Sequence, residues 1–167
     1  ILGGGQERRL RAGTEDTAAI AGFARAITLA SERREADLSH ERHLQARLIE
    51  ELPRRIPLLA ITGPRDLDQR LPGNVSCCVG FVEGESILLN LDMEGIAVST
   101  GSACTSGSLE PSHVLTAMGI DPVDTQGSLR FSLGRDNTKE DMDYVSEVLP
   151  PIIKRLRAMS PLYEKKG

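Results

Sequence analysis

The stretch LRFSLGRDNTKEDMDYVSEVLPPIIKRL, residues 129–156, combines a short strand with a long amphipathic helix. Residues 129–133 are predicted to form the strand. Thr138, with Asp141 three residues later, has the pattern of a capping box and predicts where the helix begins. Pro150 and Pro151 predict a kink or a restart within the helix. Its apolar face follows steps of three and four residues and consists of Met142, Val145, Leu149, Ile152 and Leu156.

The remaining chain alternates helices and short strands. A long helix, or two in tandem, is predicted from Thr14 as N-cap to Pro53. This order predicts the α/β fold class, with helices packed against a small sheet. Further strands are predicted over 58–61, 75–82 and 96–99, and further helices over 84–93 and from Pro111 to Gly119.

The composition is that of a globular chain with a mild negative charge. The 167 residues are 40% hydrophobic and 26% charged, with a net charge of −4, so the basic face of a general nucleic-acid binder is not expected. No apolar run approaches the roughly 20 residues of a membrane span, and no secretory signal is recognisable. Three cysteines cannot form a disulfide framework, so a reducing compartment, the cytoplasm, is expected.

Cys104 lies in the segment STGSACTSGS, residues 99–108, between a predicted strand and a predicted helix. A nucleophilic thiol needs access, small neighbours and a pliable backbone, and this composition supplies all three. The alternative is a solvent-exposed linker with an inert cysteine, since free cysteines are usually unreactive. Cys104 is the candidate catalytic residue.

Arg130 and Thr14 are two further candidates. Arg130 lies in the predicted strand 129–133 beside core residues, where an unpaired charge is costly. Its guanidinium fork suits a carboxylate, either that of a ligand or that of an internal Asp or Glu. Thr14 precedes a predicted helix, whose N-terminus could accept a phosphate. Glu15 and Asp16 would repel an anion there, which favours plain helix capping.

The other cysteines and two histidines favour structural roles. Cys77 and Cys78 would point to opposite faces of their strand, and one is expected to fill the core. With Cys104 they lack the spacing of a zinc or cluster site. His40 and His43 could share a metal, but a solvated helix face rich in Glu and Arg is favoured. No metal site is expected.

Five segments together resemble the cysteine desulfurases, the NifS/IscS-like members of aminotransferase class V in the pyridoxal-phosphate fold-type-I superfamily. They occur in the family's order and at about its spacing, and they cover nearly the whole chain. The most specific part is SACTSG, residues 102–107. The segments are GGGQER (3–8), RAGT (11–14), EGES (83–86), residues 99–112, and LRFSLGR (129–135).

The resemblance implies that the chain is the C-terminal portion of such an enzyme. Residues 1–30 would end the large domain that binds pyridoxal phosphate and start a linking helix. Residues 31–167 would form a small α+β domain, with a mostly antiparallel sheet covered by helices, and would carry the Cys104 loop.

The resemblance also implies a reaction and partners. L-cysteine would be converted to L-alanine with pyridoxal phosphate as electron sink, and Cys104 would take the sulfur as a persulfide. Arg130 would bind the substrate carboxylate, and Thr14 would contact the cofactor phosphate across a homodimer interface. The Cys104 loop would then carry the sulfur to an acceptor, such as an iron–sulfur scaffold protein.

One departure from the family concerns the lysines. The family's Schiff-base lysine lies in a Ser-His-Lys context upstream of the glycine-rich segment, and none of the lysines here fits that context. The isolated chain is therefore expected neither to bind the cofactor covalently nor to turn over cysteine. A non-catalytic sulfur-carrier or interaction module and a selenocysteine lyase are the alternatives, although a carrier has no use for Arg130 and Thr14. The lysines are Lys139, Lys154, Lys165 and Lys166.

Overall fold

A computed structural model describes residues 2–100, 112–160 and 163 of the chain. It divides into two compact units, Ile1–Ala36 and Asp37–Gly167. Helix α1, Thr17–Arg55, has its first residues in the first unit and its last residues in the second. Within the described ranges, none of the helices has the length and hydropathy of a membrane span.

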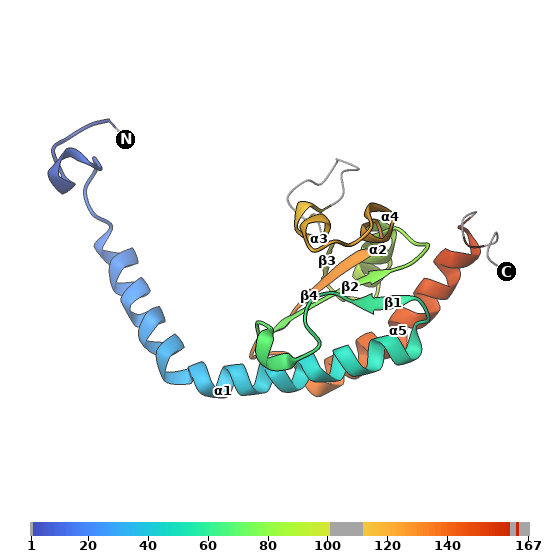
Figure 1. The fold of residues 1–167 in the computed structure, drawn as a ribbon. Helices are drawn as coiled ribbons and strands as arrows, with labels where there is room; N and C mark the ends of the chain where they lie inside the picture. The colour runs from blue at the N-terminus through green and yellow to red at the C-terminus, as the bar shows by residue number, and fades with distance from the viewer. Residues whose placement is uncertain (1, 101–111, 161–162, 164–167) are drawn as a thin grey trace. The chain divides into compact units, whose positions relative to one another are not determined.

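The second unit is built on a four-stranded sheet with strand order β1-β2-β4-β3 (Figure 1). Every neighbouring pair is antiparallel, which confirms the small antiparallel sheet expected from the resemblance. The strands are β1 (Leu59–Ile61), β2 (Asn74–Val79), β3 (Ser99–Thr100) and β4 (Ser128–Ser132).

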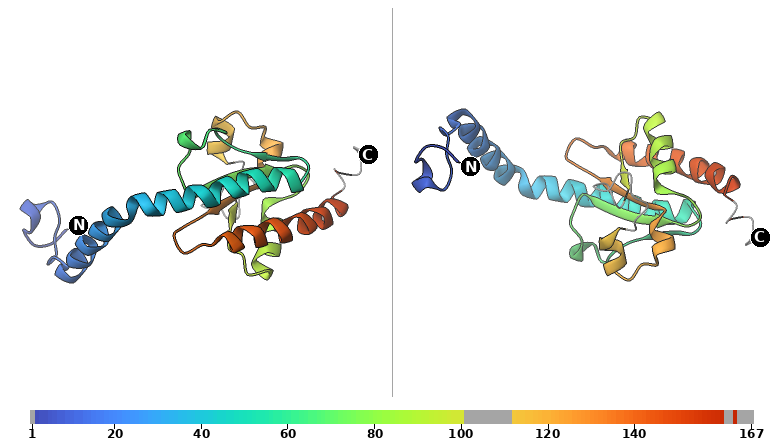
Figure 2. Two further views of the ribbon diagram at one scale, coloured as in Figure 1. Left: turned by 90° about the horizontal axis from the view of Figure 1, so that it is seen from below. Right: turned by 90° about the horizontal axis from the view of Figure 1, so that it is seen from above.

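Helices lie on both sides of this sheet. Helix α5 (Lys139–Ala158) and the part of α1 in this unit cover one face, and they run side by side in the view from below (Figure 2). The Arg47 guanidinium of α1 forms an ion pair with Asp143 of α5. The shorter helices are α2 (Gly84–Met93), α3 (His113–Ala117) and α4 (Pro122–Thr125), with 3-10 turns η1 (Glu7–Arg9) and η2 (Leu67–Gln69).

The hydrophobic core lies between the helical layer and one face of the sheet. It is aliphatic, with Phe131 as its one aromatic member among the described residues. Burial of such side chains supplies most of the free energy of folding. The fully buried members include Leu48 and Leu52 of α1, Val75, Cys77 and Val79 of β2, Ile87 and Leu91 of α2, Leu129 of β4 and Leu149 of α5.

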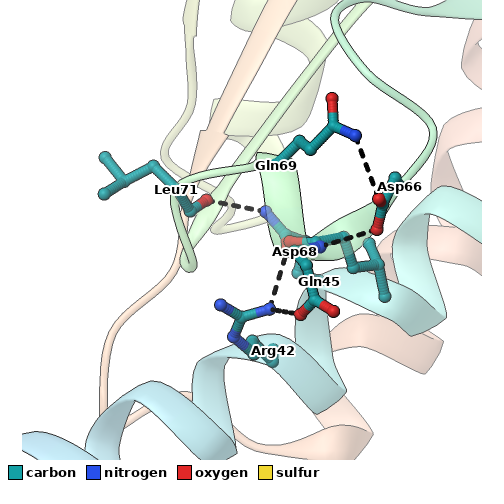
Figure 3. A network of polar contacts seen from close by, with 7 residues as sticks. Arg42, Gln45, Asp66, Asp68, Gln69 and Leu71 are labelled. Carbon is teal, nitrogen blue, oxygen red and sulfur yellow. Dashed lines mark hydrogen bonds and ion pairs between the residues drawn. The ribbon is translucent and has the colours of Figure 1, made fainter.

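A polar network ties the loop after β1 to α1 (Figure 3). The Arg42 guanidinium donates to the Asp68 carboxylate at 2.7 Å and to the Leu67 carbonyl at 3.1 Å. Gln45 is fully buried, and its Nε2 donates to the carbonyl oxygens of Leu71 and Asn74, both at 2.8 Å. Because Asn74 is the first residue of β2, Gln45 holds the start of that strand in place on α1.

Several predicted boundaries are confirmed. Thr138 and Asp141 form a complete capping box at the start of α5, with each side chain bonded to the other residue's backbone N–H. Helix α2 spans the predicted residues 84–93. Strands β1 and β4 each lie within one residue of their predicted ranges.

Other boundaries were wrong at the helix ends. Helix α1 begins at Thr17, so Thr14 is not its N-cap; the Asp16 carboxylate instead accepts from the Ala19 N–H at 3.0 Å. The helix continues past Pro53 to Arg55. The restart predicted at Pro150 and Pro151 is also wrong, because α5 is continuous there and its buried face packs on the core.

The region between β2 and α4 also departs from prediction. Strand β2 ends at Val79, because the backbone turns through a positive φ of 64° at Phe81. Strand β3 is limited to residues 99–100, and α3 begins at His113 after the N-cap Ser112 rather than at Pro111. Helix α4 was missed, although Asp121 caps it and Pro122 occupies its first turn, a common start signal.

Candidate functional site

Strand β4 places Arg130 on the sheet face that points away from the core. Side chains alternate along a strand: Leu129 and Phe131 are buried in the core at 0% and 4% exposure, whereas Arg130 and Ser132 are exposed. The sequence placed the Arg130 charge beside core residues, where it would need a partner anion. That prediction was wrong, because Arg130 is exposed on the other face of the strand. Among the described residues it forms no ion pair, so its guanidinium is available to an external anion.

Two serines lie directly beside Arg130 across the sheet. In the antiparallel register, Arg130 is opposite Ser76 of β2 on one side and opposite Ser99 of β3 on the other. Directly opposite residues share a face of the sheet. Ser76, Arg130 and Ser99 thus form a polar row across three strands, which we call the Arg130 row.

Cys104 lies outside the described residues, but its covalent connection to the Arg130 row is short. Cys104 follows Ser99 by five residues, and a fully extended chain of that length spans at most about 18 Å. Ser99 is paired with Arg130. The segment that carries Cys104 therefore starts in the strand paired with Arg130.

The other two thiols are unsuited to nucleophilic chemistry. Cys77 is fully buried and Cys78 is 5% exposed. Both side chains are therefore buried, whereas only one of them was expected to be. Burial, and then the neighbouring Cys78 thiol, raises the pKa of Cys77 to about 12. Burial, and then the charge of Asp124, raises the pKa of Cys78 to about 11. Both therefore stay protonated near neutral pH, and the thiolate is the reactive form.

The two histidines each contact a backbone carbonyl. His40 Nε2 lies 2.8 Å from the Asn137 carbonyl oxygen, and His43 Nδ1 lies 2.6 Å from that of Ser39. The part of the chain that the structure describes contains no group of three side chains able to hold a metal ion. Each of these two imidazole nitrogens contacts a backbone carbonyl oxygen, so neither contact suggests a metal shared by the two histidines.

Thr14 lies in the first unit, in an exposed loop before α1. In this loop the Gln6 side-chain oxygen accepts from the Gly13 N–H at 3.4 Å, and Arg11 donates to the Gly13 carbonyl at 3.0 Å. Arg8 and Arg9 have positive φ angles of 56° and 68°, uncommon for residues other than glycine and a mark of a constrained loop. Thr14 itself takes no part in capping α1, so the interpretation of Thr14 as a plain helix cap is wrong.

The lysines within the described residues do not share a face with Arg130. Lys139 and Lys154 are exposed on α5, the helix that packs on the core face of the sheet. A cofactor attached to either would lie on the wrong side of the sheet from the guanidinium. These residues therefore do not fit covalent attachment of pyridoxal phosphate beside Arg130.

A groove of about 770 Å³ lies near the end of β2 and α5 and is lined by none of the predicted site residues. Its walls combine apolar side chains such as Phe81 and Leu156 with the carboxylates of Glu83, Asp121 and Asp124. Asp121 is already engaged, since its carboxylate accepts from the Val123 N–H at 2.8 Å. The groove does not contribute to the Arg130 row.

Ser76 and Ser99 are the members of the site that sequence reasoning missed. A serine in a strand carries no signal of its own, and strand order and register are needed to place either one beside Arg130. The five-residue spacing between Ser99 and Cys104 is the one hint that the sequence contains.

Comparison with known proteins shows strong similarity over nearly the whole chain. The cysteine desulfurase IscS of Clostridium botulinum (strain Kyoto / Type A2) is 54% identical over 164 residues, 98% of this chain and 41% of the relative. Cysteine desulfurase IscS 1 of Archaeoglobus fulgidus is 46% identical over 165 residues, 99% of this chain and 42% of the relative. The chain thus spans about two fifths of the length of these relatives.

Solved structures agree with this similarity. A NifS-like protein superposes with a TM-score of 0.78 at 35% identity, over 93% of this chain and 38% of its own. The NifS-like protein of Rickettsia africae ESF-5 superposes with a TM-score of 0.78 at 31% identity, over 92% of this chain and 39% of its own. The family described as aminotransferase class-V matches residues 4–145. With most of its length matched and its fold shared, the chain belongs to the aminotransferase class-V family.

Proposed function

We propose that the full-length protein is a pyridoxal-phosphate-dependent cysteine desulfurase that converts L-cysteine to L-alanine and takes the sulfur on Cys104. The observation that carries this proposal is the position of Arg130, exposed and without an ion-pair partner among the described residues, beside the start of the Cys104 segment. The names of the similar proteins, cysteine desulfurases at about 50% identity, support the same reaction.

Arg130 and Cys104 have complementary roles in this proposal. The Arg130 guanidinium binds the substrate carboxylate through paired N–H groups and so fixes the substrate on the outer face of the sheet. The Cys104 thiolate attacks the substrate sulfur: an S–S bond forms, the substrate C–S bond breaks, and its electron pair stays on carbon. Protonation of that carbon gives alanine, and Cys104 is left as a persulfide.

The cofactor must be held largely by other parts of the protein. Thr14 is proposed to contact its phosphate, which the exposed position of Thr14 before α1 permits. No described lysine fits its covalent attachment, so we assign the attachment lysine to sequence beyond this chain. The similar proteins are more than twice as long, which leaves ample chain for that role.

The assembly and partners follow the same proposal. We infer a cytoplasmic homodimer in which Thr14 serves the cofactor of the other subunit, and an iron–sulfur scaffold or other protein as sulfur acceptor. Two free, buried thiols at Cys77 and Cys78 fit a reducing compartment. Light scattering of the full-length protein should give twice the subunit mass; a monomer would contradict the shared site.

The decisive variants are Cys104→Ser and Arg130→Ala in the full-length protein supplied with pyridoxal phosphate. Cys104→Ser should reduce alanine release from L-cysteine to background. Arg130→Ala should raise KM by about 10- to 100-fold, since hydrogen bonds to charged groups are worth roughly 1.5–3 kcal/mol. Arg135→Ala is the matched control, because Arg135 is exposed and paired with Asp136 in the same segment, and its kinetics should be unchanged.

The same assay separates the competing functions. A non-catalytic sulfur carrier would release no alanine from L-cysteine, yet would accept sulfur on Cys104 from a donor persulfide. A selenocysteine lyase would release alanine from selenocysteine but hardly from cysteine. Either result would overturn the proposed substrate.

A further inference from the structure

Gly84, the first residue of α2, lies where this helix meets the sheet. It is buried, and its N–H donates to the carbonyl oxygen of Gln126, just before β4, at 2.8 Å. A Cβ atom added at Gly84 would lie 2.6 Å from the Ser128 carbonyl oxygen of β4 and 3.3 Å from the Cγ2 methyl of Thr100 in β3. Helix α2 therefore approaches both strands through a residue that has no side chain.

Space, and not backbone conformation, requires glycine at this position. The φ angle of Gly84 lies outside the left-handed range, unlike that of Gly95 at 76°, so other residues could adopt its backbone conformation. A Cβ atom essentially never lies within 3.0 Å of another heavy atom, and a close-packed interior has no spare room to relieve such a contact. Any side chain at position 84 must therefore displace its neighbours.

Of the elements at this contact, β3 is held most weakly. Strand β4 is paired with β2 over five residues, and α2 is anchored by the fully buried Ile87 and Leu91. Strand β3 is an edge strand of two residues, paired with β4 on one side. Relief of the contact with Ser128 requires the first turn of α2 to move, and the Thr100 methyl packs on that same turn. A side chain at position 84 therefore disturbs the packing of Thr100 and, with it, the place of β3.

Thr100 is the last described residue before the segment that carries Cys104, and it precedes Cys104 by four residues. It is held on one side by its pairing with Leu129 and on another by the packing of its methyl group at Gly84. A displacement of Thr100 therefore reaches Cys104 through a short stretch of chain. Misplacing reacting groups by about 1 Å can lower a rate by as much as about 10²-fold.

We propose that Gly84 is a positioning residue for sulfur transfer. Because it has no side chain, α2 can fix Thr100, and Thr100 fixes the point from which the Cys104 segment leaves the sheet. The transfer of sulfur to Cys104 itself rests on the proposed function.

The test measures persulfide formation on Cys104 in a single turnover of the full-length protein with pyridoxal phosphate. Gly84→Ala should slow this step by about three- to tenfold, because the connecting chain absorbs part of the displacement. The KM for L-cysteine should change less than about twofold, since β2 keeps β4 and Arg130 in place. Gly134→Ala is the matched control and should react at the wild-type rate: apart from its chain neighbours, no described residue has a heavy atom within 4 Å of a Cβ atom added there.

Thr100→Ile reaches the same contact from the strand side. A β-branched residue suits a strand, and the larger side chain presses on Gly84, so this variant should also slow persulfide formation at unchanged KM. It decides the matter if circular dichroism shows that Gly84→Ala does not fold. An unchanged rate in either folded variant overturns the proposal. A rise in KM as large as the loss of rate also overturns it, since the effect would then lie at Arg130.

A failure of the proposed function gives a different result. If the wild-type protein releases no alanine, that function fails, and amide hydrogen exchange in the full-length protein then tests the contact by itself. Faster exchange of the peptide that contains Ser99 and Thr100 in Gly84→Ala than in Gly134→Ala supports the role of Gly84 in holding β3. Equal exchange in the two variants overturns it.

Discussion

Cys77 and Cys78 follow one another in β2, and the side chains of both are withdrawn from solvent, at 0% and 5% exposure. Their pKa values of about 12 and about 11 result chiefly from burial. Below those values the thiols remain protonated, so raising the pH from 7 to 9 leaves both almost wholly uncharged. Arg130 differs in that its side chain is exposed, although it lies on the same face of the sheet as Cys78, and an exposed charge needs no internal partner.

Thiol labelling tests this difference between the cysteines. Iodoacetamide at pH 8, applied to the native 167-residue chain, should modify Cys104 at least about tenfold faster than Cys77 or Cys78, because only a reachable thiolate reacts. Peptide mass spectrometry over time gives the three rates. Cys104→Ser should abolish the fast modification. Rapid native labelling of Cys77 or Cys78 would contradict their assigned burial.

Residue types and their local context predict part of the site. Cys104, Arg130 and Thr14 stand out in the sequence through their neighbours and through family resemblance. The exposure of Arg130 was missed, although apolar and polar residues alternate over residues 129–133, a pattern that places Arg130 on the polar face of a half-buried strand. The serines of the Arg130 row were missed because register depends on contacts between segments more than 20 residues apart in the sequence.

Among the elements, β4 and α1 decide where the Arg130 row lies. Strand β4 is central, paired with β2 on one side and β3 on the other. The start of β2 is held by Gln45 of α1 through the carbonyls of Leu71 and Asn74. The elements with strong local signals, the capped α5 and the short α2, could be predicted from sequence. The three-residue β1 was also predicted, from its apolar run after Pro57, whereas the two-residue β3 was predicted three residues too early and the four-residue α4 was missed, because both carry too little periodicity.

Gln45→Ala should lower the free energy of unfolding by about 1–3 kcal/mol, because it removes a fully buried side chain and its two partly buried hydrogen bonds to backbone carbonyls. Urea titration followed by far-ultraviolet circular dichroism measures this loss. Gln69→Ala is the matched control from the same network (Figure 3): its amide donates to Asp66 at 3.1 Å at an exposed site. Its effect should stay within about 0.5 kcal/mol. Equal effects of the two variants would contradict a special role for Gln45.

The contact between α1 and α5 gives a pH-dependent prediction. The hydrogen bond from Arg47 holds the pKa of Asp143 below its ordinary value of 3.8. A carboxyl with a lower pKa in the folded state stabilises that state above the unfolded pKa, and the contribution is lost as the pH falls through the folded value. Asp143→Asn should therefore flatten the decline of stability below pH 3.8. Urea midpoints between pH 6 and pH 2.5 measure it, and parallel profiles for wild type and variant would refute the assignment.

At the scale of the whole molecule, the chain holds one part of a proposed enzyme site. It is proposed to supply Arg130, Cys104 and Thr14, the lysines that the structure describes do not fit the cofactor, and the chain spans about two fifths of the relatives it matches. Family resemblance predicted this organisation from sequence, together with the antiparallel sheet and its covering helices. The pairing order β1-β2-β4-β3 was not predicted, since short strands with similar composition allow several orders.

The isolated 167-residue chain should not retain pyridoxal phosphate. After incubation with the cofactor and gel filtration, its visible absorbance should equal that of a cofactor-free sample, while circular dichroism confirms that it is folded. The full-length protein treated in the same way should keep a bound absorbance band. A retained band in the isolated chain would show that a lysine within residues 1–167 holds the cofactor.

The most direct test of the central claim is the chemical state of Cys104 after a single exposure to substrate. Full-length protein with pyridoxal phosphate is mixed with one equivalent of L-cysteine, alkylated, digested and analysed by mass spectrometry. We predict one added sulfur atom on the Cys104 peptide, one alanine released per persulfide, and loss of both signals in Arg130→Ala at the same low substrate concentration. Alanine release with an unmodified Cys104 peptide would contradict the account.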